Sequence, residues 1–168
     1  MSYRYQFVTT KIGHFLLLSR NDRLVYVGGP QSQLEDARDA LHLTDGQSFE
    51  EIALAPGLVT AFEQLFSGAT APMDPCLYEV RGTDFQQAVY EQLRAVPFGE
   101  TRTYTQLAAA MGKPNAVRAV AHAVAQNPLL IVQPCHRIVP KSAGIGQYSG
   151  GRELKRKLLD FEAGKCVD

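Results

Sequence analysis

The sequence predicts a two-part α/β protein, with an N-terminal α/β domain on a small antiparallel sheet and a mainly α C-terminal domain. Short apolar runs separated by turn residues fill the start of the chain, which is typical of strands. Helix-capping patterns precede apolar stripes at helical spacing in the second half. The Ala- and Pro-rich stretch 69–75 indicates a linker. We therefore expect domains at 1–78 and 79–168.

Three strands and two helices are expected in the first domain. Apolar runs lie on either side of Gly13 and of the turn residues Asn21 and Asp22, at hairpin spacing. The expected strands cover 5–8, 15–18 and 24–27, and the expected helices cover 33–43 and 56–66. His14 and His42 have no partners at metal-ligand spacing, so we expect no metal site here.

The second domain begins with a helix and continues with a helix-turn-helix. Capping patterns at Thr83/Gln86 and Thr103/Gln106 start a helix to about residue 96 and a shorter one at 104–111. A tight turn then leads into a helix at 116–126. Two short helices across such a turn form a motif that many DNA-binding proteins use.

The second helix of this motif has an unusual surface. Asn115, Arg118, His122 and Gln126 share one face, and most of the other exposed positions are alanine. Small side chains allow close approach to a nucleic-acid groove, with one long cation projecting. A solvated helix packed on its neighbour by alanines explains the same pattern equally well.

Charge and cysteine content narrow the function classes. Residues 1–78 carry five basic and nine acidic side chains, net −4, whereas residues 79–168 carry twelve and eight, net +4. Only the second half is thus suited to binding a polyanion, although an ordinary random distribution of surface charges also gives such a difference.

Three widely spaced cysteines indicate reduced thiols and no zinc site. With no apolar run for a membrane span and a polar start, we expect a soluble cytoplasmic protein, or a nuclear one in a eukaryote.

The motif at 131–140 carries the clearest chemical signal. Cys135 is followed by His136, entered through Pro134 and flanked by apolar pairs. A thiolate is a strong nucleophile, and a neighbouring imidazole lowers the cost of forming it. We expect this segment to be a strand, where adjacent side chains point to opposite faces, so the pair needs a local turn or a bridging water. A buried structural cysteine beside a surface histidine is the alternative for an isolated pair.

The chain after this motif adds a glycine-rich loop at 141–151 and a helix at 152–162. Basic residues cluster at the start of the helix, and Glu162 lies on its apolar side, four residues after Leu158. A carboxylate that faces a core needs a partner, and His136 is the candidate we expect.

Several motifs together resemble the O6-alkylguanine-DNA alkyltransferases. The run from Pro134 to Ile138, with Asn127-Pro128 before it and residues 148–151 after it, resembles the active-site signature of that family. Tyr104 and the helix that carries Arg118 stand where the family has its DNA-binding helix-turn-helix. The resemblance covers about 83–164. It implies a ribonuclease H-like N-terminal domain and a winged helix-turn-helix C-terminal domain.

The resemblance also implies a function, which is DNA repair by direct damage reversal. The alkyl group of O6-alkylguanine, and less readily of O4-alkylthymine, would pass irreversibly to Cys135 after the nucleotide is flipped out of the duplex. Each molecule would act once, as a suicide enzyme. The implied partner is double-stranded DNA bound through its minor groove, with no cofactor, by a protein that is monomeric in solution; cooperativity on DNA is left open.

The family pattern assigns roles to particular residues. Cys135 would be the acceptor, held as a thiolate, His136 would take its proton through a water, Glu162 would orient the imidazole, and Asn127 would bond near the thiol. The implied substrate contacts are Tyr104 at guanine N3, Tyr148, Ser149 and the backbone near Ile145 at O6 and the base edge, and Lys155 at O6. The implied DNA contacts are Arg118, inserted into the duplex, with Thr105, Asn115 and Lys141.

This sequence departs from the pattern at three positions. Gln133 and Pro140 stand beside the motif where the pattern predicts other residues, valine or isoleucine in the case of Gln133, and Tyr90 replaces a common tryptophan. Some relatives carry an N-terminal zinc site, for which we find no ligand set.

Two other functions remain open: a non-enzymatic module that binds alkylated bases, and a cysteine hydrolase, which leaves the helix-turn-helix without a purpose.

Overall fold

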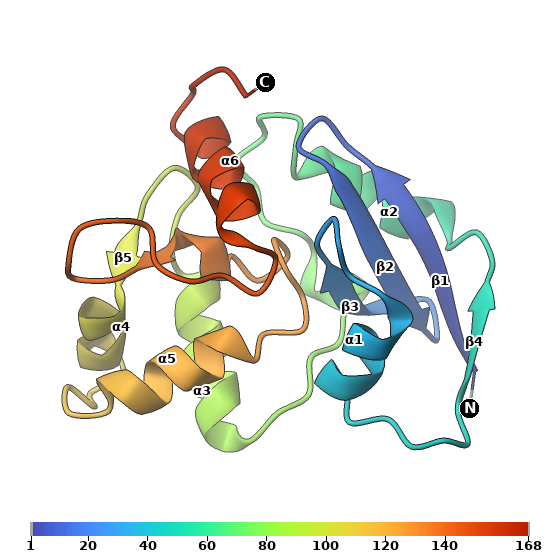
Figure 1. Cartoon of the computed structure of the whole chain (residues 1–168), viewed down its shortest axis with the longest axis horizontal. Coiled ribbons are helices and arrows are strands. Elements are labelled where there is room, and N and C mark those ends of the chain that lie inside the picture. Colours follow the sequence, from blue (N-terminus) through green and yellow to red (C-terminus); the bar gives the residue numbers. More distant parts are fainter. Residues whose placement is uncertain (1, 168) are drawn as a thin grey trace. The chain divides into compact units, whose positions relative to one another are not determined.

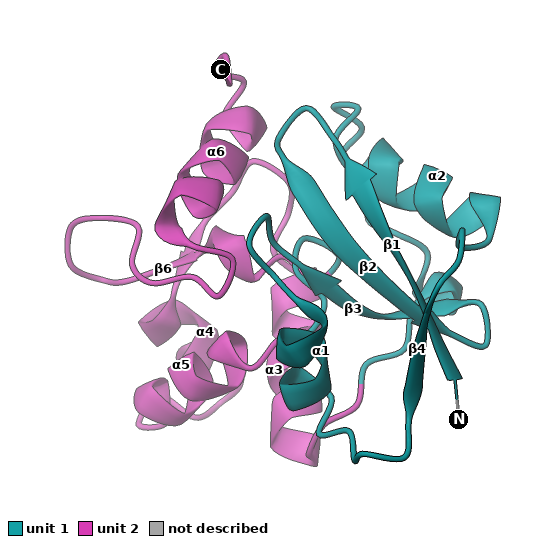
Figure 2. Ribbon diagram, turned by 45° about the vertical axis from the view of Figure 1, so that its right-hand side comes forward, with its two compact units in different colours: residues 1–80, 128–132 teal, residues 81–127, 133–168 magenta. Residues whose placement is uncertain are grey.

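The computed structural model describes residues 2–167 and divides the chain into two compact units (Figures 1 and 2). Unit 1 extends to Val80 and includes Pro128–Val132, and unit 2 consists of Arg81–Asn127 with the chain from Gln133 onward. The short segment belongs to unit 1 because it bonds to a strand there. Val27 N donates to Pro128 O (2.9 Å), and Leu130 N donates to Val27 O (3.3 Å).

Unit 1 is built on a four-stranded mixed sheet in the order β3-β2-β1-β4. The strands are β1 (Ser2–Thr9), β2 (His14–Arg20), β3 (Arg23–Gly28) and β4 (Ser48–Glu51). β1, β2 and β3 pair antiparallel, as the hairpin spacing predicts, and Asn21 and Asp22 take positive φ in the two-residue turn.

The prediction of a three-stranded antiparallel sheet is wrong in one respect, because β4 adds a fourth strand parallel to β1. The β4 sequence is Ser-Phe-Glu-Glu, and only Phe49 is partly buried. An exposed edge strand of this composition carries no apolar alternation from which it could be predicted.

Both faces of the sheet in unit 1 are covered, which explains the continuous apolar run in β2. The Phe15 ring packs edge-to-face on Phe62 of α2 (Pro56–Gln64) and stacks on Phe66 just after it, with ring centroids 5.5 Å apart in both pairs. Leu16 and Leu18 pack with Ala37 of α1 (Leu34–Ala40) on the other side. A strand buried on both faces has no polar alternation. A short 3-10 turn, η1 (Pro75–Leu77), begins at the last residue of the expected linker.

Unit 2 contains the helices α3 (Asp84–Arg94), α4 (Tyr104–Ala110), α5 (Val117–Ala125) and α6 (Arg152–Glu162). The capping boxes at Thr83 and Thr103 are both formed, as the sequence predicts. α5 packs against α3 and α4 (Figure 1), and its residues Val120 and Val124 are buried. A two-residue parallel pair, β5 (Arg102–Thr103) with β6 (Ile138–Val139), lies next to this helix-turn-helix.

The expected strand at 131–140 is largely wrong. Only Ile138 and Val139 form a strand, and Cys135–Arg137 forms a 3-10 turn, η2. Cys135 N donates to Gln133 O (2.7 Å) across Pro134, which closes the chain too tightly for a strand. The turn lets Cys135 and His136 both be buried in unit 2, whereas a strand would direct them to opposite faces.

Candidate active site

Cys135 lies at the start of η2 with its sulfur against a buried amide. Only 4% of the residue is exposed, and Asn127 Nδ2 donates to Sγ at 3.1 Å. The other two cysteines, Cys76 and Cys166, are exposed free thiols. Burial and a directed donor thus distinguish Cys135 from both.

Burial raises the pKa of the Cys135 thiol above its ordinary value of 9.0. The Asn127 hydrogen bond, the charge of Lys155 and the hydroxyl of Tyr148 act in the opposite direction without reversing the effect. The thiol is therefore protonated at neutral pH, and the expectation of a resting thiolate is not met. A reaction at this sulfur needs a base that takes the proton as the reaction proceeds.

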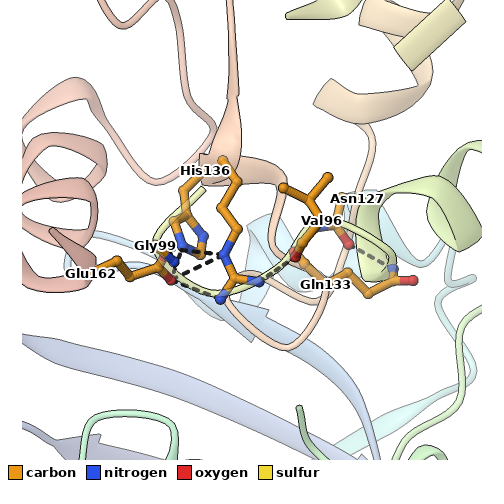
Figure 3. A network of polar contacts seen from close by, with 7 residues as sticks. Val96, Gly99, Asn127, Gln133, His136 and Glu162 are labelled. Carbon is orange, nitrogen blue, oxygen red and sulfur yellow. Dashed lines mark hydrogen bonds and ion pairs between the residues drawn. The ribbon is translucent and has the colours of Figure 1, made fainter. Parts of the chain in front are cut away.

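Next to the cysteine, a buried network joins η2 to the end of α6 (Figure 3). His136 Nε2 lies 2.7 Å from Glu162 Oε1, which is the pairing expected from the helix face. Arg137 holds the same carboxylate through Nη2 (2.9 Å) and Nε (2.9 Å) and donates to Val96 O through Nη1 (2.8 Å). Gly99 N donates to Glu162 Oε2 at 3.4 Å. His136 is fully buried, and its hydrogen bond to the carboxylate fixes the orientation of the imidazole ring.

The charges in this network determine which nitrogen carries the imidazole proton. Burial tends to raise the pKa of Glu162, but the hydrogen bonds from His136 and Arg137 and the positive charge of Arg137 lower it to about 2. Burial lowers the pKa of His136, so the ring is neutral at pH 7. An ionised carboxylate can only accept, so Nε2 carries the proton and Nδ1 has the lone pair. Among residues 2–167, the buried Nδ1 has no hydrogen-bond partner. His136 is thus arranged as a base.

Lys155 is a buried cation on α6. Its Nζ donates to Ile138 O (2.6 Å) and Gln147 O (3.4 Å) and lies 6.0 Å from the Tyr148 ring centre. Burial lowers the pKa of Lys155 to about 8, although Cys135 acts to raise it. The positive charge of this ammonium acts to lower the pKa of the Cys135 thiol.

The glycine-rich loop runs close to Lys155 and the end of β6. Gly146 has φ +78°, and a Cβ there would lie 2.9 Å from Pro140, so only glycine fits without strain. Ser149 Oγ donates to Ala125 O at 3.0 Å, which ties the loop to α5. Ile145 is half-buried in the same loop. These contacts hold the loop in position against Pro140 and α5.

An open cavity of about 750 Å³ lies in unit 2 between the helix-turn-helix and the start of the loop. It contains four of the predicted substrate- and DNA-binding residues, namely Tyr104, Thr105, Arg118 and Lys141. Arg118 is exposed on α5, and Asn115 is exposed in the turn before it, outside the cavity lining. Burial raises the pKa of Tyr104, and Cys135 adds to this effect, so its hydroxyl remains a donor.

Three residues of the site were missed or undervalued from the sequence. Arg137 fixes Glu162, Gln133 donates to the Asn127 side-chain oxygen, and Arg94 donates to the Gln133 side chain. The sequence marks Gln133 only as a departure from the family pattern. The available signal was a polar side chain within the apolar run 129–132 and next to Pro134.

Neither a membrane span nor a metal cluster is found in the part of the chain that the structure describes. No helix within residues 2–167 has the length and apolar character to cross a bilayer. No three His, Cys, Asp or Glu side chains within this range lie in a group that could hold a metal ion.

Comparisons with known proteins agree with this geometry. The family model for the 6-O-methylguanine DNA methyltransferase DNA-binding domain matches residues 84–164. A methylated-DNA–protein-cysteine methyltransferase of Haemophilus influenzae is 32% identical over 98% of this chain and 88% of that protein. A probable enzyme of the same name from Acanthamoeba polyphaga mimivirus is 54% identical, but the match covers 50% of this chain and 56% of that protein.

A solved structure matches almost the whole chain. The Mycobacterium tuberculosis OGT in complex with DNA has a TM-score of 0.78 and 31% identity, covering 98% of this chain and 94% of that one. Identity and coverage at this level extend beyond the C-terminal motif to unit 1. This chain therefore belongs to the family of methylated-DNA–protein-cysteine methyltransferases.

Proposed function

We propose that this protein repairs DNA by moving the alkyl group of O6-alkylguanine, and less readily of O4-alkylthymine, onto Cys135 Sγ. The observation that carries the proposal is the Cys135 thiol. It accepts a hydrogen bond from Asn127 and is followed directly by the neutral His136, whose ring Glu162 fixes. The unit that contains these residues also matches the family's DNA-binding domain.

The chemistry is a direct displacement at the alkyl carbon. The sulfur forms a new S–C bond while the C–O6 bond breaks, and the guanine keeps the electron pair of the broken bond. The thiol proton passes through a water to His136 Nδ1, and ionised Glu162 stabilises the resulting imidazolium. Because a thioether is not hydrolysed, each molecule acts once, without a cofactor.

Donors around the base stabilise the departing guanine anion. We assign this role to the hydroxyl of Tyr104 at N3, and contact with O6 and the base edge to Tyr148, Ser149 and the backbone near Ile145. Lys155 adds positive charge near O6. This assignment is supported by the place of the half-buried Tyr104 and the buried Lys155 in unit 2. The charge of Cys135 raises the pKa of both groups.

The sulfur cannot reach O6 in a stacked duplex, so the nucleotide must be flipped out. Arg118, exposed on the alanine-rich α5, is placed to fill the vacated position from the minor groove. Thr105, Asn115 and Lys141 are exposed near it or along the same cavity and would contact the backbone. A helix of small residues with one long cation is better suited to binding in the minor groove than to reading base edges in the major groove.

The finer fold description is part of the same proposal. The pair β5–β6 beside α4 and α5 supports a winged helix-turn-helix. Three antiparallel strands with a fourth parallel to the first support a ribonuclease H-like unit 1. We further propose that the protein is a monomer in solution and works in the cytoplasm, or in the nucleus of a eukaryote.

The test compares Cys135→Ala with the control Cys166→Ala, which removes an exposed thiol. Each protein is incubated with a duplex that holds one O6-methylguanine, and both restored guanine and lesion binding are measured. The wild type and Cys166→Ala should restore one guanine per protein, and Cys135→Ala none, while all three bind. Restoration by Cys135→Ala overturns the proposal, and binding without restoration by the wild type indicates a lesion-binding module.

A further inference from the structure

Gln133 is a fully buried amide directly before the Pro-Cys-His-Arg motif. Its exposed fraction is 0%, yet both ends of its side chain are bonded. Oε1 accepts from Arg94 Nη1 at 2.7 Å, and Nε2 donates to Asn127 Oδ1 at 2.9 Å. The second of these contacts is visible in Figure 3. Three side chains thus form a chain of hydrogen bonds that ends at the Cys135 sulfur.

The direction of this chain is fixed at its outer end. An arginine guanidinium has only donors, so Gln133 must turn its oxygen toward Arg94. Its NH₂ group then faces Asn127, which must present its own oxygen to accept that bond. The remaining NH₂ group of Asn127 faces the sulfur of Cys135 at 3.1 Å and Gln133 O at 2.9 Å.

We infer that Gln133 and Arg94 are positioning residues that keep the NH₂ group of Asn127, and not its oxygen, directed at the Cys135 sulfur. They do not touch the reacting atoms. A valine or isoleucine at position 133 could make neither of these side-chain hydrogen bonds. The inference rests on the proposed role of Cys135 as alkyl acceptor.

The orientation matters because the two ends of the amide have opposite effects on a developing thiolate. An N–H donor stabilises negative charge on sulfur, whereas a carbonyl oxygen repels it. Asn127 is only 5% exposed, so solvent cannot replace a misdirected donor. The backbone oxygen of Gln133 supports the same orientation, and the side chain adds a second contact that fixes the other end of the amide.

The variants that test this inference differ in what they present to Asn127. Gln133→Met has a similar size and no donor. Gln133→Glu keeps the acceptor for Arg94 but offers Asn127 an oxygen in place of a donor. Arg94 is half-buried. Arg94→Met removes the group that donates to the Gln133 oxygen, and Arg94→Lys keeps a donor there. Gln64→Glu, on an exposed part of α2, is the matched control.

Two rates are measured against pH for each variant. One is the reaction with free O6-benzylguanine base, and the other is carboxamidomethylation of Cys135 by iodoacetamide, followed by peptide mass so that the exposed cysteines do not interfere. The other titratable groups near this sulfur, Lys155, Tyr148, Tyr104, Tyr90 and the His136–Glu162 pair, stay unchanged in all variants.

We expect Gln133→Met to react about tenfold more slowly at neutral pH, which corresponds to one lost hydrogen bond. The loss should disappear as pH rises, because the thiolate then forms without help. Gln133→Glu should lose more than Gln133→Met, Arg94→Met should lose rate in the same way, and Arg94→Lys and Gln64→Glu should match the wild type.

Equal losses at every pH, or unchanged rates, would overturn the inference, since a merely structural role lowers the rate without moving its pH profile. The two rates also separate this inference from the proposed function. If the wild type fails with O6-benzylguanine and with alkylated DNA, the proposed function fails, while the iodoacetamide profile still tests the amide orientation.

Discussion

At the scale of single residues, the site is a protonated thiol beside a neutral base. Cys135 has a raised pKa because it is buried, so the protein stores a neutral sulfur that does not react with solvent electrophiles as a free thiolate does. His136 is neutral because it too is buried, and Glu162 stays ionised because His136 and Arg137 surround it. Reactivity therefore depends on moving one proton within the unit.

Glu162→Gln tests this proton movement. The glutamine oxygen still accepts from His136 Nε2, but the negative charge that stabilises the imidazolium is lost. We expect the single-turnover rate with O6-benzylguanine to fall on the order of a hundredfold, within the range of general-base effects. An unchanged rate in a folded variant would contradict the role of Glu162.

Arg118→Ala tests the residue proposed to enter the duplex. Only duplex DNA requires a nucleotide to be flipped out, so repair of an O6-methylguanine duplex should slow at least tenfold, while reaction with free O6-benzylguanine stays unchanged. Arg152→Ala, an exposed arginine on α6, is the control. Equal losses with both substrates would assign Arg118 to the structure of the unit.

At the scale of elements, caps and turns place these residues. The Thr103 side chain accepts from Gln106 N at 3.1 Å and starts α4, the helix that carries Tyr104. Thr103→Ala should lower the free energy of unfolding by about 1 kcal/mol, which is the usual cost of a lost N-cap. Urea unfolding measures this, with the exposed Thr105→Ala on the same helix as the control. Equal losses in the two variants would show that the cap does not stabilise the unit.

Elements with a local signal could be predicted from the sequence, and elements without one could not. The capping boxes of α3 and α4 and the hairpin from β2 to β3 each arise from residues a few positions apart. β4 pairs with β1 across more than forty residues and has no apolar alternation of its own. The η2 turn looked like a strand because its β-branched neighbours favour one, whereas Pro134 and the Gln133–Cys135 hydrogen bond close it.

The residues of the candidate active site also divide into those with a local sequence signal and those without one. Glu162 could be matched to His136 because its place on the apolar side of a helix required a partner. Arg94 and Gln133 lie 39 positions apart, and no spacing rule connects α3 to the segment before η2. Their contact appears only when the fold brings them together.

At the scale of the whole molecule, the buried groups make stability depend on pH. The pKa of His136 is lowered from 6.5 in the folded protein. Below pH 6.5 the imidazole therefore binds a proton in the unfolded chain more readily than in the folded protein, and stability is lost as pH falls. The pKa of Glu162 is lowered from 4.5 to about 2, so further stability is lost between these values. Urea unfolding should give a free energy that falls from pH 7.5 to pH 4. A constant or rising value would contradict the buried neutral imidazole.

The central claim is that one buried sulfur receives the alkyl group. The most direct measurement is the intact mass of the protein, followed by peptide mapping, after incubation with a duplex that carries O6-methylguanine. We predict a gain of one methyl group per molecule, on Cys135 alone, with no further gain on longer incubation. An unchanged mass while the duplex is repaired, or a methyl group on Cys76 or Cys166, would contradict it.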